Sequence, residues 1–599
     1  MANDKRNSWE KFQKLNFNSK KLSKSAQKAE GATVRHARKF IVHRWDNIRS
    51  VRRHVIGWLV LVGVLIAAVG LQLNWFQRSY SMEAPIAGGT YAEAAVGPVE
   101  NLNPLYSETS AERSANNLLF SSLYDYDSAG ALRADLATNM QISEDGTVYT
   151  ITIRDDVRWH DGTKLTADDV VFTVNTIKDP STRSTIRGWQ DIDVAALNDT
   201  TVTFTLPATY APFPHALTSV FIIPEHLLGD VQSSLLRENN FSQEPVGTGP
   251  YELQFLQTVD SNNGRKIVHM AANERYYKGS AKIPRFQLHV YGDSDAIATA
   301  LRTSEVNAAT DLSLDSIANI DRNRYTVTAH TINNGVYTLF NTQSEVLKDR
   351  TVRRALQAAT NTNAIRQEIS GDVQPLHLPF VNGQLQGEGV PAPPAFSTAR
   401  AKELLDDAGW QLLDDGSRVK GDDVLELRLT TLKGSEYEKV VEVLARQWRE
   451  VGIGVQVEVL DPADSRQNVS QRLQQREFDV LVYELSIGAD PDVYAYWHSS
   501  QDSSRLLNLS GYMNGQSDDS LSSARSTLDP VLRNAKYINF AEQWLEDVPA
   551  IGIYQSVMYY VHSRNSETVS EDIKLVTPSD RYADVRYWTV NKGTVYKTP

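Results

Sequence analysis

The fold is decided by the stretch Leu425–Leu460, LELRLTTLKGSEYEKVVEVLARQWREVGIGVQVEVL. Apolar and polar residues alternate at its two ends, as in half-buried strands. The middle part carries one apolar stripe at helical spacing, formed by Val440, Val441, Leu444, Trp448 and Val451. Gly452 follows this stripe and suits the end of a helix. The order strand, helix, strand predicts a βαβ unit in a parallel sheet.

The segment that follows predicts a further strand with polar residues at its end. After a helix expected at about Asp464 to Gln475, the run FDVLVYEL at Phe478–Leu485 is apolar enough to be a central strand. Ligands of open α/β sheets bind outside the carboxyl ends of the strands. The next residues, SIGADPD, contain Asp490 and Asp492 and are therefore a candidate binding segment.

Asp490 and Asp492 are followed closely by the aromatic residues Tyr494 and Trp497. A carboxylate in a partly desolvated cleft needs a cationic partner or several hydrogen-bond donors. Aromatic side chains supply apolar walls, and a ring face attracts a cation. This combination predicts recognition of a ligand ammonium group. An alternative stays open, in which an aspartate caps a turn beside the intervening proline and the aromatic rings belong to the core.

Charge divides the chain of 599 residues into two parts. Met1–His54 contain fifteen Lys and Arg but only four Asp and Glu, whereas the remainder is acidic. Between these parts, Val55–Gln77 carry no charge. At about 1.5 Å per residue, a helix of this length spans a hydrocarbon core of about 30 Å. We expect a retained transmembrane helix, because the basic region is too long for the alternative, a cleaved signal peptide.

The basic tail also predicts the topology. Positive-inside bias places the N-terminus in the cytoplasm and the chain after about Arg78 outside, as a single-pass protein of the cell membrane. We interpret the tail as a topology signal or a contact with anionic lipid, and we expect no nucleic-acid partner.

Composition and motifs argue for a binding protein. The chain has no cysteine, which excludes disulfides, thiolate metal sites and catalytic thiols. It lacks the sequence motifs of zinc proteases, serine hydrolases, P-loop proteins and dinucleotide-binding enzymes, and its twelve histidines are not spaced as metal ligands. We expect no enzymatic activity, cofactor or metal site. The length predicts two or three lobes.

A smaller sheet is expected earlier in the chain. ISEDGTVYTITIRDDVRW, at Ile142–Trp159, has the alternation of a strand, a turn and a second strand. Shortly after it, Thr166 and Asp169 match a capping box at the start of a helix.

An ordered series of motifs resembles a known family. The series comprises GGTYAEA from Gly88, VENLNPL from Val99, HDGTKLTADDVVFT from His160, EPVGTGPYEL from Glu244, YTLFNTQSEVLKDRTVRRALQAATNTNAI from Tyr337, ARAKELLDDAGW from Ala399, REFDVLVYELSIGADPD from Arg476 and SGYMNGQSDDSLSSARSTLDP from Ser510. It covers about Gly88 to Arg564 and resembles the peptide/nickel class, family 5, of extracytoplasmic solute-binding proteins of ABC transporters.

The resemblance implies an α/β fold, a two-lobed periplasmic-binding-protein-like clamp with an additional small domain, preceded here by one transmembrane helix. The implied divisions are a tail at 1–54, the membrane helix at 55–77, a linker at 78–87, lobe I at 88–122, 245–331 and 552–599, the extra domain at 123–244 and lobe II at 332–551. Asn334 and Gly335 then mark a candidate hinge between the lobes, which close over the ligand.

The resemblance also implies binding residues. In peptide-binding relatives an aspartate of the second lobe receives the α-ammonium group, and the Ala-Asp of SIGADPD matches this motif at Asp490, with Asp492 as a rival. Segments of both lobes pair with the peptide main chain by strand addition. These segments would be Glu108, Thr109, Ser110 and Ala111 on one side and Ile487, Gly488 and Ala489 on the other, with Tyr494 and Trp497 beside them.

The sequence thus predicts a monomeric receptor, anchored through Val55 to Gln77, that captures short peptides and delivers them to the permease subunits of an ABC importer. The nickel-binding branch of the family uses a histidine near the Asp-Pro motif, and here the nearest one, His498, comes only after the aromatic residues. Two alternatives stay open: a clamp for another solute, such as an oligosaccharide or a metal chelate, and a sensory or adhesion receptor.

Overall fold

The computed structural model describes residues 45–261, 264–369, 373–503 and 507–596. The chain divides into two compact units, Met1–Ala84 with Gly593–Pro599, and Pro85–Lys592. Most of the predicted basic tail, residues 1–44, lies outside the described residues. The contacts group Pro85–Lys592 as one unit, so the lobe boundaries inferred from the sequence stay predictions.

The first unit contains a long apolar helix, α2 (Trp45–Tyr80). Its segment Arg52–Phe76 has a mean hydropathy of 2.4, and none of it is buried within the protein. By length and composition it is a candidate membrane span. After α2, strand β1 (Ser81–Ile86) pairs with β22 (Asn591–Tyr596) in a two-stranded sheet.

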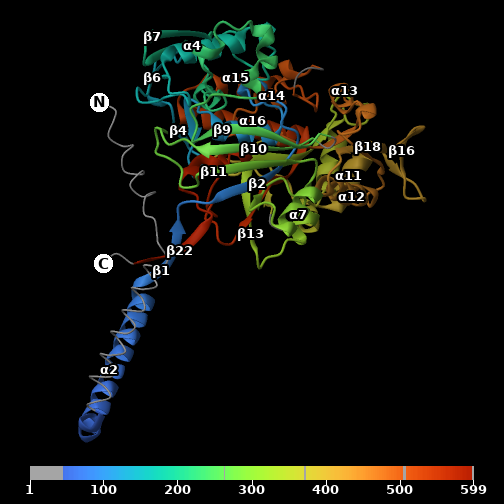
Figure 1. Ribbon diagram of the computed structural model, residues 1–599. Coiled ribbons are helices and arrows are strands. Elements are labelled where there is room, and N and C mark those ends of the chain that lie inside the picture. The colour runs from blue at the N-terminus through green and yellow to red at the C-terminus, as the bar shows by residue number, and fades with distance from the viewer. Residues whose placement is uncertain (1–44, 262–263, 370–372, 504–506, 597–599) are drawn as a thin grey trace. The chain divides into compact units, whose positions relative to one another are not determined.

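The second unit is built on an 11-stranded mixed sheet, visible in part in Figure 1. Its main path runs in the order β19-β18-β20-β13-β21-β12-β2-β11-β10-β9, and β14 pairs with β21. The strands are β2 (Thr90–Val96), β9 (Tyr251–Asp260), β10 (Arg265–Ala272), β11 (Arg285–Tyr291), β12 (Ala308–Ala309), β13 (Tyr325–Phe340), β14 (Gln374–Pro375), β18 (Glu426–Leu432), β19 (Gly454–Leu460), β20 (Val480–Ser486) and β21 (Ala550–Ser563).

Two long antiparallel strands, β13 and β21, cross from one half of this sheet to the other. β21 pairs with β12 at one end, and β13 pairs with β20 at its other end, through Asn334–Phe340. The register of the β13–β21 pair shifts between Thr331 and Gly335. A Cβ atom on Gly335 would lie 2.4 Å from Leu376 Cδ2, so a larger residue at this irregular crossing would force neighbouring side chains to shift.

The βαβ unit predicted from the sequence is confirmed. α12 (Ser435–Arg449) connects β18 and β19, which pair in parallel from Glu426 with Gly454 to Leu432 with Leu460. The apolar stripe of α12 is buried, and Gly452 has a φ of +92° beyond the helix end. The helix expected at Asp464 to Gln475 is wrong as a single element. Asn468, at φ +48°, separates a 3-10 turn from α13 (Val469–Gln474).

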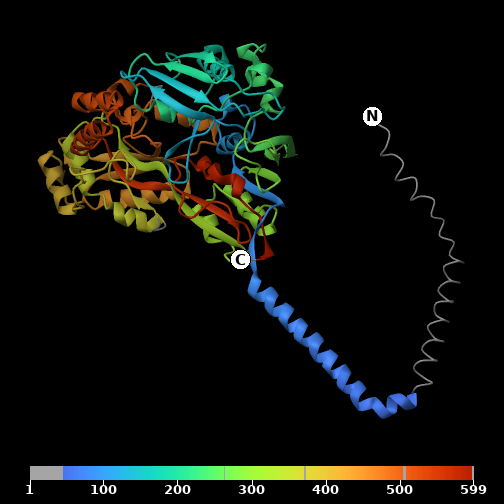
Figure 2. The ribbon, with the colours of Figure 1, turned by 90° about the vertical axis from the view of Figure 1, so that its left-hand side faces the viewer.

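The predicted hairpin belongs to a separate four-stranded antiparallel sheet, ordered β5-β6-β8-β7. Its strands are β5 (Ala137–Ile142), β6 (Val148–Ile153), β7 (Asp193–Asn198) and β8 (Thr201–Thr205). The capping box of Thr166 and Asp169 begins α4 (Ala167–Lys178), as predicted. In both views of the unit this sheet, in teal, lies at one end (Figure 1, Figure 2).

Buried apolar side chains form separate clusters on the two sides of the crossing. One cluster includes Tyr91, Leu118 and Trp159, a second includes Trp448, and a third includes Trp497. The remaining elements used below are α3 (Ser110–Leu119), β3 (Tyr124–Tyr126), α14 (Tyr494–Trp497), α15 (Gly515–Arg525), α16 (Pro530–Asp547) and the 3-10 segment η8 (Pro578–Tyr587). Apolar clusters on both sides of two crossing strands are the architecture of a hinged clamp.

Candidate ligand-binding site

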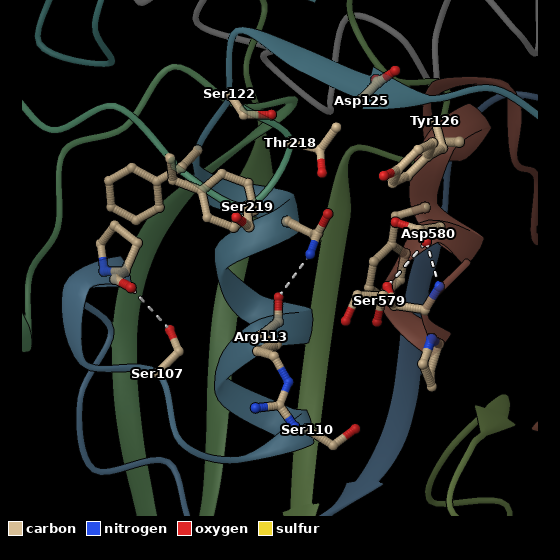
Figure 3. A pocket seen from close by; sticks show the side chains of 18 of the residues that line it. Ser107, Ser110, Arg113, Ser122, Asp125, Tyr126, Thr218, Ser219, Ser579 and Asp580 are labelled. Carbon is tan, nitrogen blue, oxygen red and sulfur yellow. Dashed lines mark hydrogen bonds between the residues drawn. The ribbon is translucent and has the colours of Figure 1, made fainter. Parts of the chain in front are cut away.

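A cavity of about 770 Å³ lies between elements from both halves of the large sheet. One side is formed by α3, β3 and η8, and the other by Ile332 and Asn334 of β13 and Glu484 and Ser486 of β20. Figure 3 shows α3 with Ser110 and Arg113 on one wall and η8 with Ser579 and Asp580 on another. We call this space the interlobe cavity.

Hydroxyl groups are the most frequent polar groups of the interlobe cavity. The hydroxyl-bearing side chains that line it are Ser107, Ser110, Ser121, Ser122, Tyr126, Thr185, Thr218, Ser219, Ser486, Thr577, Ser579 and Tyr582. Apolar walls come from Phe120, Ile186, Phe221 and Ile332. Because a hydroxyl both donates and accepts hydrogen bonds, this lining suits the amide and carbonyl groups of a peptide main chain.

The first predicted edge segment reaches the interlobe cavity through one residue, Ser110. Thr109 is the N-cap of α3: its hydroxyl accepts from the Glu112 amide at 3.1 Å, and the Glu112 carboxylate accepts from the Glu108 and Thr109 amides. Ala111 is buried, and the Glu108 side chain pairs with Arg237 at 3.1 Å. The capping box therefore fixes this edge and leaves Ser110 facing the cavity.

The opposing predicted segment uses its main-chain groups within the protein. The amides of Ile487 and Gly488 donate to the Asn333 carbonyl at 2.9 and 3.1 Å. The Gly488 carbonyl accepts from the side chains of Asn333, through Nδ2, and Gln384, through Nε2. Gln384 Nε2 also donates to the Ala489 carbonyl at 3.2 Å. The neighbouring Ser486 lines the interlobe cavity instead.

Asp490 is held by an arginine from α16. Arg533 Nη1 and Nη2 donate to the two carboxylate oxygens at 2.6 and 2.5 Å, and both side chains are about one-tenth exposed. The Asp490 carboxylate raises the pKa of Arg533 well above its ordinary value, against the lowering effect of burial. His215 Nε2 lies 4.0 Å from the same carboxylate. Asp490 does not line the interlobe cavity.

Asp492 is held in the same way by α15. Arg525 Nε and Nη2 lie 3.0 and 2.9 Å from Asp492 Oδ2, and the Tyr210 hydroxyl donates to this oxygen at 3.2 Å. Tyr210 belongs to the segment that follows β8, and the adjoining Ala211 amide donates to the Arg525 carbonyl at 2.9 Å. We call Asp490, Asp492, Arg525 and Arg533 the aspartate–arginine cluster.

The aromatic residues near these aspartates have structural contacts. Trp497 is 1% exposed and packs edge-to-face against Trp544 at 5.5 Å and Tyr337 at 6.2 Å. Tyr494 stacks on His498 and receives the Arg525 guanidinium over its ring at 4.1 Å. Trp497 is thus a core residue, and the ring of Tyr494 is covered by a cation of the protein itself.

Sequence reasoning missed Arg525 and Arg533, because each lies on a helix far along the chain from the aspartate it binds. No local pattern links them to SIGADPD. The motif SGYMNGQSDDSLSSARSTLDP contains Arg525, but only the packing of α15 against the binding segment shows its partner.

Two carboxylates of the interlobe cavity have cationic partners. Asp125 receives Arg133 Nε and Nη2, each at 2.9 Å. Lys278 bridges Asp125, at 3.5 Å, and Asp135. Burial still raises the pKa of Asp125 because the Arg133 pair offsets only part of the desolvation.

Three other carboxylates of the cavity are held by neutral donors. Asp580 accepts from the Thr577 amide at 2.6 Å and its hydroxyl at 3.0 Å (Figure 3). Asp311 accepts from the Val96 amide at 3.1 Å. Glu484 accepts from Asn334 Nδ2 at 2.9 Å and from the Tyr437 hydroxyl at 3.0 Å. We call Asp311, Glu484 and Asp580 the unpaired carboxylates.

Burial changes the acidity of two of these groups. It raises the pKa of Asp580 to about 6, although the Thr577 hydrogen bonds favour the charged form. Burial also raises the pKa of Asp311, and the nearby Arg581 opposes that shift. The cavity therefore disfavours its own negative charges. In the described residues, no group of three or more His, Cys, Asp or Glu is arranged to hold a metal ion.

Two lobes with a cavity between them define a solute-binding protein of the clamp type, and comparison with known proteins gives the family. The family described as bacterial extracellular solute-binding proteins, family 5, matches residues 131–505. The chain belongs to this family. At the level of the family, its relatives are receptors for solutes rather than enzymes, and they serve ABC importers.

Individual relatives show two kinds of ligand. The oligopeptide-binding protein AppA of Bacillus subtilis is 26% identical over 83% of this chain and 91% of that protein. Its structure with a nonapeptide has a TM-score of 0.69, with 25% identity over 84% of this chain and 99% of that one. NikZ of Campylobacter jejuni, in complex with Ni(L-His), has a TM-score of 0.71 and 26% identity, with coverage of 84% and 99%. Protein XP55 of Streptomyces lividans is 30% identical over 75% of this chain and 81% of that protein.

Proposed function

We propose that the chain is a membrane-anchored receptor that captures short peptides in the interlobe cavity and delivers them to the permease of an ABC importer. The observation that carries this proposal is the hydroxyl-rich lining of a cavity between two lobes. Its volume lies within the roughly 300–1,000 Å³ typical of small-ligand pockets. Main-chain hydrogen bonds then give affinity without fixing the side chains of the ligand.

The lining favours a peptide over a nickel–histidine chelate. Among the described residues that line the cavity there is no histidine, and His498 stacks on Tyr494 and bonds to the Ser500 amide. A free imidazole near the ligand is the side chain that a metal chelate would most readily use. The similarity to AppA supports the peptide reading as well.

The proposed peptide contacts differ from the binding residues predicted from the sequence. Ser110 lines the interlobe cavity, which supports its predicted role beside the ligand. We propose that Asp492 stabilises the closed clamp through Tyr210, and that Asp490 stabilises its own lobe through Arg533, so that neither carboxylate receives the peptide ammonium group. Two charges that already satisfy one another would have to separate before either bound a ligand, and separating a largely buried pair is costly.

Binding is tested with a pool of di- to pentapeptides, by native mass spectrometry and thermal shift. We expect peptides to co-purify with the intact chain and to raise its melting temperature. Ser110→Trp fills the cavity wall and should abolish both effects, whereas Ser570→Trp, at an exposed position, should retain them. If no peptide binds the intact chain, or if Ser110→Trp binds peptides as well as the native chain, the proposal is wrong.

The anchor is tested by labelling. Because the chain has no cysteine, single variants Ser8→Cys and Ser570→Cys are clean probes of sidedness. A membrane-impermeant maleimide should label only Ser570→Cys in intact cells, and the chain should resist alkaline extraction from membranes. Labelling of both variants, or release by alkali, would contradict a retained helix at Arg52–Phe76 with a cytoplasmic N-terminus.

A further inference from the structure

The charges that line the interlobe cavity do not balance. Five carboxylates face it, those of Asp125, Asp135, Asp311, Glu484 and Asp580, whereas Arg113 supplies the one guanidinium among the described lining residues. Arg133 and Lys278 compensate the first two carboxylates. Within the described ranges, the three unpaired carboxylates take part in no ion pair.

The unpaired carboxylates stand on both sides of the cavity. Asp580 comes from η8 and Asp311 follows β12, whereas Glu484 comes from β20 across the crossing strands. A single positive group between these walls would attract carboxylates from both halves of the clamp. Ligand charge would then favour the closed state directly, because the ligand interacts more strongly with that state.

Arg113 is a positively charged side chain of the same cavity. It lies on α3, its Nη1 donates to the Glu108 carbonyl at 3.1 Å, and its side chain is exposed to the cavity (Figure 3). In the described part of the chain it makes no ion pair with a carboxylate, unlike Arg525 and Arg533. Its planar guanidinium matches a carboxylate with two parallel hydrogen bonds.

We infer that the interlobe cavity selects peptides with a basic side chain, whose positive group is received by Asp580 and Glu484 while Arg113 binds the peptide carboxylate. This inference rests on the proposed function and names the substrate class of the same site. An ordinary zwitterionic peptide brings no net charge, so it leaves the excess of carboxylates in place. A lysine- or arginine-containing peptide brings one more positive charge and neutralises part of that excess.

The raised pKa of Asp580 supports the same conclusion. Burial and the neighbouring Asp125 both raise the pKa of Asp580, so its negative charge is unfavourable while no cation is paired with it. A positive ligand group placed within hydrogen-bonding distance relieves that cost and gains a charge-assisted hydrogen bond.

The test is titration calorimetry of the full chain in nanodiscs of phosphatidylcholine, a net-neutral lipid that does not attract cationic peptides. Ala-Lys-Ala, Ala-Met-Ala and Ala-Glu-Ala are compared, because lysine and methionine have side chains of similar length. We expect Ala-Lys-Ala to bind at least about tenfold more tightly than Ala-Met-Ala, which corresponds to one charge-assisted hydrogen bond, and Ala-Glu-Ala to bind most weakly.

Three variants locate the effect. Asp580→Asn and Glu484→Gln keep the shape of each side chain and should remove most of the preference for lysine over methionine. Arg113→Met should weaken all three peptides and should equalise Ala-Lys-Ala with its C-terminally amidated form. Glu542→Gln, an exposed carboxylate on α16, is the charge-matched control and should change nothing. Circular dichroism checks that each variant is folded.

The outcomes separate the two claims. If the three peptides bind equally, the peptide receptor stands and the charge selection is wrong. If Asp580→Asn and Glu484→Gln are folded but keep the full preference for lysine, the selection does not come from these residues and the inference is overturned. If none of the three peptides binds the native chain, the proposed function fails together with the inference.

Discussion

Two groups of carboxylates differ in how the fold treats their charge. In the aspartate–arginine cluster, Asp490 and Asp492 each meet a guanidinium at 2.5 to 3.0 Å. In the interlobe cavity, Asp311, Glu484 and Asp580 meet amides and hydroxyls. The first group carries the recognisable sequence motif, and the second is scattered along the chain.

The contrast shows that the most recognisable acidic motif of a sequence need not supply the carboxylates that line the cavity. Asp492, which follows β20, pairs with Arg525 of α15 and accepts from Tyr210, a residue that packs against the apolar cluster of Tyr91, Leu118 and Trp159. A carboxylate with an internal cation has little to gain from a ligand cation, whereas a partly buried carboxylate with neutral partners gains much.

The largest effect is expected from Arg533→Ala, which leaves Asp490 without its cation. Removing one partner of a largely buried pair should lower the free energy of unfolding by about 3 kcal/mol, measured by urea denaturation. Arg446→Ala, at an exposed position of α12, should stay within about 0.5 kcal/mol of the native chain. If Arg533→Ala keeps its stability and binds peptides more tightly, Asp490 is the ammonium partner after all.

The second effect is a pH dependence of binding. The pKa of Asp580 is raised to about 6, so this carboxylate is charged above pH 6 and protonated below it. The groups facing it include Asp125, Tyr126 and Thr577, and Asp125 also has a raised pKa. Affinity for Ala-Lys-Ala should fall by about tenfold between pH 7 and pH 5, because one proton then competes with the ligand cation.

The stability of the unliganded chain should depend on pH with the opposite sign, again because of Asp580. Its folded pKa lies above the unfolded value of about 3.9, so the native state binds more protons between these two pH values. The contribution of this group to stability therefore decreases as pH rises from about 4 to 6. Asp580→Asn should remove both pH effects, and an unchanged pH profile of binding in that variant would show that another group is responsible.

A smaller effect is expected from Tyr210→Phe, which removes the hydroxyl that donates to Asp492. Loss of this hydrogen bond should destabilise the closed state by about 1 kcal/mol. The measurement is the population of closed molecules by energy transfer between dyes on Leu197→Cys and Val424→Cys, both exposed positions. Tyr587→Phe, also exposed, is the control, and equal closure in both variants would rule out a role of the Tyr210 hydroxyl in closure.

The smallest effect is expected for Asp490→Asn on peptide binding. Since Asp490 does not line the cavity, the dissociation constant should change by less than about threefold. N-acetylation of the peptide should act equally on the native chain and on this variant. A variant that has lost its discrimination between free and acetylated peptides would restore the assignment made from the sequence.

Much of the fold could be predicted because its signals are local. The stripe on α12 and the alternation of β18 and β19 recur within a few residues, and the Thr166 capping box involves neighbours in sequence. The break at Asn468 was missed because a single left-handed residue leaves the apolar pattern intact. For the candidate site, the family resemblance predicted Ser110, which lines the cavity, whereas Asp580 was not predicted, because its surroundings contain no recognisable motif.

Three properties could be read from the sequence without knowledge of distant contacts. The family follows from the resemblance of an ordered series of motifs, the mixed α/β class from periodicity, and a segment long enough to span a membrane from composition. Three-dimensional packing, in contrast, settles which carboxylates are paired with a cation and which line the cavity without one. Arg533 and Asp490 are 43 residues apart, and Glu484 and Asp580 meet one cavity from separate elements. Electrostatic environment depends on distance in space and on burial, and neither is encoded in the spacing of residues along the chain.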